Sequence, residues 1–356
     1  MRVRIVGAPP RYIQGPGVLA QLAPRLAEFG RRPFIIADPS AGDALRQELE
    51  QHLKETSDRV IFGLASGACT AAEIARFAET ARTLEADLLA GLGGAAALGI
   101  AKGVSLTARL PLIALPIAPC CHAAVSRVID VEAEGEAPAE TRLMPLPPDL
   151  VVADTAAFAA APARLFIAGI GDAIARKFEI EQGAAAGAQN LLGGSAGLLA
   201  AAAADGAYRA LREDAIAALA LRTRRSGGEA LERVVEAMLL LGGIAHESGG
   251  PSIAHGLARG FAALPACRTA LHGELVAFAL LAQLVLEERP ADLLADLRGF
   301  YRSLGLPTRL AELGIVADAT AAAETAARRA GEAWLIPLDA KRLARAILDA
   351  DALAAQ

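Results

Sequence analysis

The stretch LLAGLGGAAALGIAKG, residues 88–103, combines a short apolar strand, a glycine turn and an apolar helix. We expect the strand over 88–91 and the helix over 95–104. A strand that passes through a tight turn into a helix is typical of a parallel sheet, because the helix returns the chain to the edge where the next strand starts. The turn has two interpretations. Its first N–H groups could hold a pyrophosphate at the positive end of the helix dipole, or its glycines only allow close packing.

The same alternation extends through the first 150 residues and predicts a parallel sheet with helices on both faces. The expected strands are 2–6, 33–37, 59–63, 110–116 and 149–158, and the expected helices include 17–29, 47–54 and one that Thr70 and Glu73 begin with a capping box. Asp38 follows one of these strands. It either accepts a hydrogen bond from a dinucleotide ribose, where it would repel a 2′-phosphate, or is merely the turn residue before Pro39.

The second half of the chain has mostly helical periodicity. We expect a hairpin or flap over 128–142 that bridges the halves. The expected helices that follow are 166–181, 207–222, 231–242, 275–288, 291–304, 320–330 and 340–353. The sequence therefore predicts two domains, an α/β domain over 1–155 and an all-α domain over 156–356.

Charge and cysteine usage exclude several classes of protein. The chain has 356 residues and a formal net charge of −5, so it lacks the positive charge that neutralises nucleic-acid phosphates. The N-terminal arginines precede no apolar core long enough for a signal peptide, and no basic amphipathic segment suits a membrane surface. The four cysteines have no C-x-x-C spacing. We expect a cytoplasmic protein with neither a nucleic-acid nor a membrane partner.

Three of the five histidines lie between residues 246 and 274, and two of them, His255 and His272, lie on apolar segments. A single histidine on an apolar face is usually a packing residue. Here Asp172, in GIGDAIARKFE, adds a carboxylate. Two imidazoles and one carboxylate form the usual ligand set of a catalytic divalent metal. We therefore weigh a metal site against a packing role.

The chemistry of this ligand set narrows the choice of metal. A hard carboxylate with borderline imidazoles suits Zn²⁺ or Fe²⁺ better than Ca²⁺ or Mg²⁺. Gly169 and Gly171 are expected to let the backbone bring Asp172 to the top of a helix. The third histidine, His246, lies near the ligand segment and is expected to have a surface or core role, with support of the metal ligands as the alternative.

Several motifs, in order and spacing, resemble the glycerol dehydrogenase branch of the iron-containing alcohol dehydrogenases. They are RYIQGPGVL from Arg11, GACTAAEI from Gly67, the GLGG turn, LVVADT from Leu150, ESGGPSIAHGL from Glu247 and LHGELVAFALLAQLVLE from Leu271. The resemblance implies a Rossmann-like N-terminal domain, an all-helical C-terminal domain and a nicotinamide cofactor, NAD(H) with NADP(H) as the alternative. It also implies zinc or iron at Asp172, His255 and His272, and a homo-oligomer.

Some positions depart from the pattern of that family. In the phosphate loop, Ala95, Ala96 and Gly99 stand where a glycine, a lysine and an aspartate are expected. In PIAPCCHAAVS, aligned without a gap, Ile117 replaces a threonine that touches the cofactor, and His122 replaces an aspartate associated with substrate binding and proton relay. An imidazole is a suitable proton donor near neutral pH and, when protonated, a partner for a carboxylate.

Two further departures lie close to His255. Ala258 replaces a second family histidine, and Arg259 replaces an asparagine and could reinforce His122 in binding a carboxylate. The hydroxycarboxylate dehydrogenases, which reduce 2-oxo acids, are similar in lacking the aspartate and the loop lysine. Drift in a protein with an unrelated substrate explains the same changes.

We therefore expect a metal-dependent, NAD(P)-linked oxidoreductase that acts on a small alcohol or polyol, with 2-oxo acid reduction as the alternative. A sugar-phosphate cyclase would need a dense basic pocket, and a catalytically silent homologue would not need the complete ligand set. The assigned residues are His122 as proton shuttle, Asp38, Gly93, Gly94, Ala95 and Ile117 for the cofactor, and Asp172, His255 and His272 for the metal.

Overall fold

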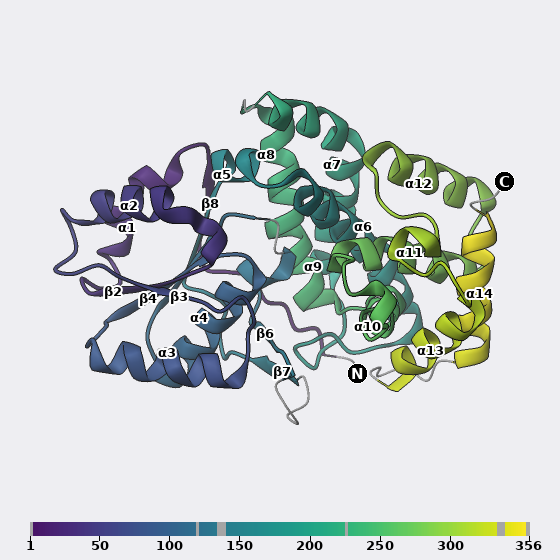
Figure 1. The fold of residues 1–356 in the computed structure, drawn as a ribbon, viewed down its shortest axis with the longest axis horizontal. Coiled ribbons are helices and arrows are strands. Elements are labelled where there is room, and N and C mark those ends of the chain that lie inside the picture. The colour runs from purple at the N-terminus through teal and green to yellow at the C-terminus, as the bar shows by residue number, and fades with distance from the viewer. Residues whose placement is uncertain (1–2, 119–120, 134–139, 225–226, 333–338, 354–356) are drawn as a thin grey trace. The chain divides into compact units, whose positions relative to one another are not determined.

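The computed structural model describes residues 3–118, 121–133, 140–224, 227–332 and 339–353, and it divides into two compact units (Figure 1). The sheet unit consists of Gly7–Ala161 and Ala220–Ile244, and the helical unit consists of Met1–Val6, Pro162–Leu219 and Ala245–Gln356. The functional division at residue 155 stays a prediction. The compact units cross that division at residues 1–6, 156–161 and 220–244.

The sheet unit contains six parallel strands in the order β1-β8-β5-β4-β2-β3, which confirms the predicted parallel sheet. The strands are β1 Tyr12–Gly15, β2 Pro33–Ala37, β3 Ile61–Leu64, β4 Leu88–Gly93, β5 Leu112–Pro116 and β8 Leu150–Asp154. The strand predicted at residues 2–6 is wrong. Arg4 in that segment makes only an isolated bridge to Ser195, within the helical unit.

Helices cover both faces of this sheet, because its strands are apolar on both sides. In β2, Phe34 and Ile36 pack with the apolar residues of α3 and α4, whereas Ile35 and Ala37 pack with those of η1, α1 and α2. The helical segments are η1 Val18–Gln21, α1 Ala23–Leu26, η2 Pro39–Ala41, α2 Gly42–Leu53, α3 Ala71–Thr83 and α4 Ala95–Ala108. The helix predicted over 17–29 is thus two short segments, η1 and α1.

The remainder of the sheet unit includes the predicted hairpin. Its strands β6 Val128–Val131 and β7 Glu140–Leu143 pair antiparallel. Thr70 caps α3, since its side chain accepts from the N–H of Glu73. The predicted capping box is only half formed, because the Glu73 carboxylate accepts from the N–H of Ser66. The other segments of this unit are η3 Cys121–Ala124, α5 Thr155–Ala160, α8 Glu229–Glu236 and the π-helix η4 Ala237–Leu241.

The helical unit is built around α11, which packs against α6, α10, α12 and α14. Its helices are α6 Ala163–Ala186, α7 Leu198–Thr223, α9 Gly242–Gly249, α10 Ile253–Ala262, α11 His272–Leu286, α12 Ala291–Leu304, α13 Ala319–Glu332 and α14 Ala340–Leu353, with η5 Pro265–Cys267 and η6 Leu310–Leu313 between them. α7 continues to Thr223 and α9 begins at Gly242, so both cross into residues of the sheet unit. The predicted helical half is confirmed, but α10 was not predicted as a helix.

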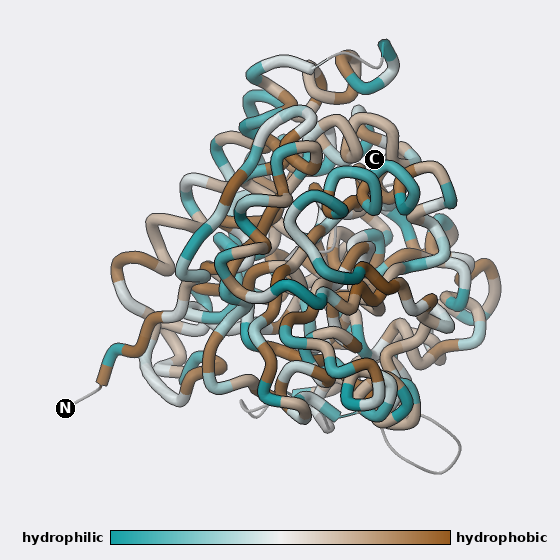
Figure 2. Tube along the Cα trace, turned by 90° about the vertical axis from the view of Figure 1, so that its left-hand side faces the viewer, coloured by the Kyte–Doolittle hydropathy of each residue, from teal (hydrophilic) through white to brown (hydrophobic). Residues whose placement is uncertain are grey.

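Figure 2 shows hydrophobic and hydrophilic residues mixed along the coiled segments of the chain, as is usual in amphipathic helices. α11 and α10 are more deeply buried, with 11 of 15 and 8 of 10 residues buried, respectively. None of the described helices is both long enough and apolar enough to cross a membrane.

The contact between α10 and α13 depends on a glycine. A Cβ at Gly260 would lie 2.2 Å from the carbonyl oxygen of Ala326, whereas a Cβ at Gly299 in α12 would meet nothing within 4 Å. We therefore expect Gly260→Ala to destabilise the protein by about 1–3 kcal/mol through overpacking. The matched Gly299→Ala should stabilise it by up to about 1 kcal/mol through helix propensity. Thermal unfolding of both variants tests this contact, and equal melting temperatures would contradict it.

Candidate metal and cofactor site

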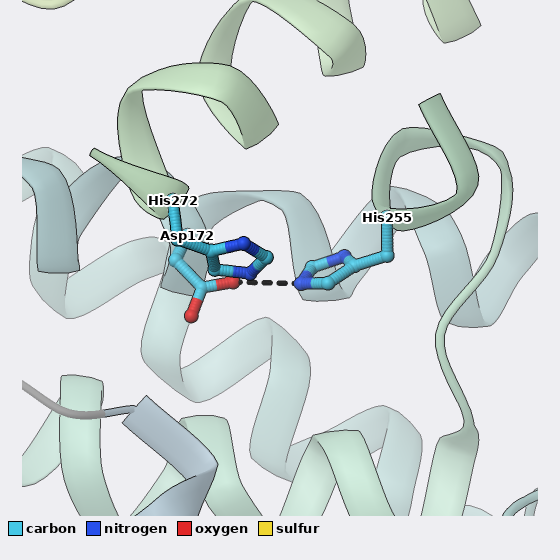
Figure 3. A group of neighbouring side chains, drawn as sticks. All are labelled: Asp172, His255 and His272. Atoms are coloured by element: carbon cyan, nitrogen blue, oxygen red, sulfur yellow. Dashed lines mark hydrogen bonds and ion pairs between the residues drawn. The ribbon is translucent and has the colours of Figure 1, made fainter. Parts of the chain in front are cut away.

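The helical unit brings together the three residues predicted to bind metal (Figure 3). Asp172 lies in α6, His255 in α10, and His272 is the first residue of α11. One ligand atom from each lies within 4.8 Å of the other two. Asp172 and His255 are buried, whereas His272 is exposed, so this cluster is accessible on the side of His272.

A close approach of α6 and α11 places Asp172 beside His272. A Cβ at Gly273 would lie 1.8 Å from the carbonyl oxygen of Ala168, so the two helices touch through their backbones there. The expectation that Asp172 lies at the top of a helix is wrong, because α6 runs from Ala163 to Ala186 and Asp172 lies inside it. Gly171 instead allows the packing, since its Cβ would be 2.7 Å from the oxygen of Gly273.

Side chains from α6 also hold the start of α11. Arg164 donates to both carboxylate oxygens of Glu274, over 2.6 and 2.7 Å, and to the carbonyl oxygen of Thr269. Glu274 in turn accepts from the backbone N–H of Leu271 at 2.8 Å. Because His272 follows Leu271 directly, this bidentate pair holds the backbone that carries the third candidate ligand.

The two carboxylate oxygens of Asp172 have different surroundings. Oδ1 accepts from Nη2 of Arg176 at 2.8 Å and lies 2.8 Å from Nε2 of His255. Oδ2 is buried and has no hydrogen-bond partner among the described residues. Burial by itself would raise the pKa of Asp172, but the Arg176 charge and the hydrogen bond from His255 outweigh it and hold this pKa well below its usual range. The carboxylate is therefore ionised, with one oxygen unpaired.

Two buried charged residues that were not predicted from the sequence, Arg176 and Glu179, lie beside this cluster. Nδ1 of His255 lies 2.7 Å from Oε2 of Glu179, and Nη1 of Arg176 lies 3.7 Å from the same oxygen. Arg176 also contacts Nδ1 of His246, which is buried. A signal was present, because Asp172, Arg176 and Glu179 are spaced by four and three residues and so share one face of a helix.

The ionisation of Glu179 and His255 follows from the same contacts. Burial would raise the pKa of Glu179, but the charge and hydrogen bond of His255 and the Arg176 charge lower it overall. Burial and Arg176 would lower the pKa of His255, but the two carboxylates bonded to its ring raise it. The network is thus held by charge-assisted hydrogen bonds throughout.

These residues fit a divalent cation. A buried, ionised carboxylate oxygen without a partner is costly, and a cation would satisfy it. His255 has the surroundings of a metal-binding imidazole, because its far nitrogen is bonded to a carboxylate.

The sheet unit brings together three of the residues predicted to bind the cofactor. A Cβ at Gly93 would lie 2.4 Å from Cβ of Asp38, and the N–H of Ile117 donates to the oxygen of Gly93 at 3.3 Å. Gly93 has φ of 151°, which favours glycine, so this residue permits the approach of Asp38. Asp38 also accepts from the N–H of Ser40 at 2.8 Å, so Asp38 acts as a turn residue, as one of its two interpretations predicted.

The end of α4 beside this loop is open. The N-cap residue of α4 is Gly94, which has no side chain to cap the helix. A Cβ built on Gly94 would meet nothing within 4 Å. Ala95, the first helical residue, is exposed. An uncapped helix N-terminus with space in front of it has the properties of a phosphate site.

The positions that depart from the family pattern lie in different surroundings. A Cβ at Gly99 would be 2.9 Å from Sγ of Cys69, so the fold has no room for the expected aspartate there. Ala258 is fully buried and Arg259 is exposed, both on α10. His122 belongs to η3, but its side chain lies outside the described part of the structure.

Comparisons with known proteins agree with this geometry. Residues 9–155 match the model of the iron-containing alcohol dehydrogenase family. The chain is 34% identical to a glycerol dehydrogenase of Escherichia coli O6:H1 over 323 residues, which covers 89% of this chain and 87% of the relative. It is also 34% identical to a glycerol dehydrogenase of Thermotoga maritima over 314 residues, covering 86% and 84% of the two chains.

A solved structure described as a probable glycerol dehydrogenase from Sinorhizobium meliloti 1021 matches 99% of both chains, with a TM-score of 0.92 and 32% identity. Sequence and fold therefore agree over nearly the whole chain, and the resemblance inferred from its motifs is confirmed. The chain belongs to the iron-containing alcohol dehydrogenase family, in its glycerol dehydrogenase-like branch, and is an oxidoreductase that acts on alcohols.

Proposed function

We propose that this oxidoreductase interconverts glycerol, or another small vicinal diol, and the corresponding hydroxycarbonyl compound with NAD(H). The observation that carries the proposal is the cluster of Asp172, His255 and His272, with its unpaired buried oxygen, in a chain whose relatives are glycerol dehydrogenases along most of their length. Reduction of 2-oxo acids is not favoured, since these relatives are named for a polyol.

In this proposal Asp172, His255 and His272 hold Zn²⁺ or Fe²⁺. When bound, such a cation polarises the alcohol oxygen and lowers its pKa. The chain contributes orientation. Arg176 occupies Oδ1 of Asp172 and leaves Oδ2 for the metal, and the exposed position of His272 leaves one side of the cluster accessible to substrate.

The cofactor residues belong to the sheet unit. We assign the pyrophosphate to the N–H groups of Gly93, Gly94 and Ala95 at the positive end of α4, where no side chain caps the helix. Asp38 accepts from the adenosine ribose and disfavours NADP(H), because its charge repels a 2′-phosphate. Ile117 lines the loop beside Gly93, since the two are joined by a backbone hydrogen bond.

His122 is our candidate for the residue that accepts the proton of the alcohol. Oxidation of the alcohol moves a hydride from carbon to the nicotinamide and releases the hydroxyl proton, which a neutral imidazole accepts. We also propose that the protein works in the cytoplasm as a homo-oligomer, as its composition and family suggest.

Metal content tests the metal assignment. Protein purified anaerobically without chelator should contain about one zinc or iron ion per chain, measured by elemental analysis. His255→Ala should lose the metal and the activity, because it removes a ligand. The control is His52→Ala, which alters a half-buried histidine on α2 in the sheet unit and should retain both. Equal metal content in the two variants would sink the site.

A substrate panel tests the reaction. We expect NADH oxidation with dihydroxyacetone to have a kcat/KM at least about tenfold above that with pyruvate or other 2-oxo acids. A site that binds hydroxyl groups has polar groups that stay unpaired when a substrate without those hydroxyls is bound. A preference for 2-oxo acids would overturn the proposed substrate class. Inactivity with every substrate would indicate a catalytically silent homologue.

The pH dependence of kcat/KM tests His122. A base must be neutral to accept a proton, so oxidation of glycerol should fall as pH drops through the ordinary imidazole pKa of about 6.5. His122→Asn should lower the rate and remove this limb of the profile. A profile shared by the wild type and the variant would remove His122 as the proton shuttle.

A further inference from the structure

Both carboxylate oxygens of Glu179, a residue of α6, are used by the first turn of α10. Oε1 accepts from the backbone N–H groups of Ser252, at 2.7 Å, and His255, at 3.0 Å. Oε2 lies 2.7 Å from Nδ1 of the His255 ring. The side chain of Glu179 is completely buried, with a relative exposure of 0%, so water does not compete for these hydrogen bonds.

The start of α10 is therefore capped by other helices. Its N-cap residue, Ser252, makes no side-chain hydrogen bond to the helix. The N–H of Ala254 instead donates to Oε1 of Gln283, a residue of α11, at 2.9 Å. Since helix N-termini leave several N–H groups without partners, Glu179 and Gln283 together supply what α10 lacks.

The contact with the His255 ring has a chemical consequence beyond capping. An ionised carboxylate can only accept hydrogen bonds, so Nδ1 of His255 must carry the hydrogen in this pair. Nε2 lies 2.8 Å from the carboxylate of Asp172 and, for the same reason, carries a hydrogen in the metal-free protein. A metal that displaced this hydrogen would find the lone pair on Nε2, because Glu179 keeps the other hydrogen on Nδ1. We propose that Glu179 is a positioning residue that selects the ring tautomer of His255 and thereby makes Nε2 a metal ligand. This inference rests on the metal site proposed above.

A purely structural role for Glu179 predicts different behaviour from a tautomer-selecting role, and Glu179→Gln separates the two. The amide oxygen of glutamine should face the two backbone N–H groups, because turning it away would oppose donors to donors twice. Its NH₂ group would then face Nδ1 of His255 and donate to it. The cap of α10 is kept, but the ring is driven to the tautomer with hydrogen on Nε2, which cannot bind a metal there.

The second variant is Glu179→Met, which has a similar length, no charge and no hydrogen-bonding group. It removes the cap but does not force the wrong tautomer. We expect the melting temperature of the metal-free protein to fall in the order wild type, Glu179→Gln, Glu179→Met. We expect zinc affinity, measured by competition with a chromophoric chelator, to fall about 10- to 100-fold in Glu179→Gln. Glu179→Met should bind zinc at least as tightly as Glu179→Gln.

Gln283→Met serves as the matched control for loss of capping, since the described hydrogen bonds of Gln283 go to Ala254, Phe178 and Glu287 and not to the His255 ring. It should melt at a lower temperature and bind zinc as the wild type does. Zinc affinities that follow the melting temperatures, with Glu179→Gln above Glu179→Met, would overturn the tautomer role and leave the metal site intact. If wild-type protein bound zinc no more tightly than His272→Ala, the metal site itself would fail, and the inference with it.

Discussion

The backbone contact between α6 and α11 is the constraint on which the metal cluster depends. Only glycine fits at position 273, because any Cβ there would lie 1.8 Å from the carbonyl oxygen of Ala168. The contact brings the first residue of α11, His272, next to Asp172 in the interior of α6. Arg164 and Glu274 fix the same helix end from the outside. Helix packing rather than loop geometry thus sets the distances between the candidate ligands, which makes them rigid.

The second organising feature is the charged face of α6. Asp172, Arg176 and Glu179 are buried together, and a buried charge is tolerated only when it is paired and hydrogen-bonded. Among the described residues, each member of this face has such partners except for one oxygen, Oδ2 of Asp172. In the proposed function, a cation would complete the network at this oxygen. On the side of Asp172, the proposed metal binding therefore depends on a single atom, Oδ2.

The phosphate loop of the sheet unit keeps its backbone arrangement although several of its residues depart from the family pattern. Gly93 is required by the approach of Asp38, and the end of α4 stays open without a lysine at position 96. The backbone N–H groups and the helix dipole do not depend on side chains, so they remain available to a phosphate. Gly99 is required by the neighbouring Cys69, which explains the missing aspartate as a packing matter.

The sequence by itself determined the parallel sheet, the helical half and the three candidate ligands, because strand periodicity, turn glycines and ligand chemistry are local properties. Only the tertiary structure decided the rest. α10 contains two glycines and takes its caps from Glu179 and Gln283, so its helical state depends on residues distant in the chain. The roles of Glu179 and Arg176 likewise depend on what faces them. Their spacing places them on the face of α6 that carries Asp172, but their partners His246 and His255 are far away in the sequence, so these contacts become visible only when the chain is folded.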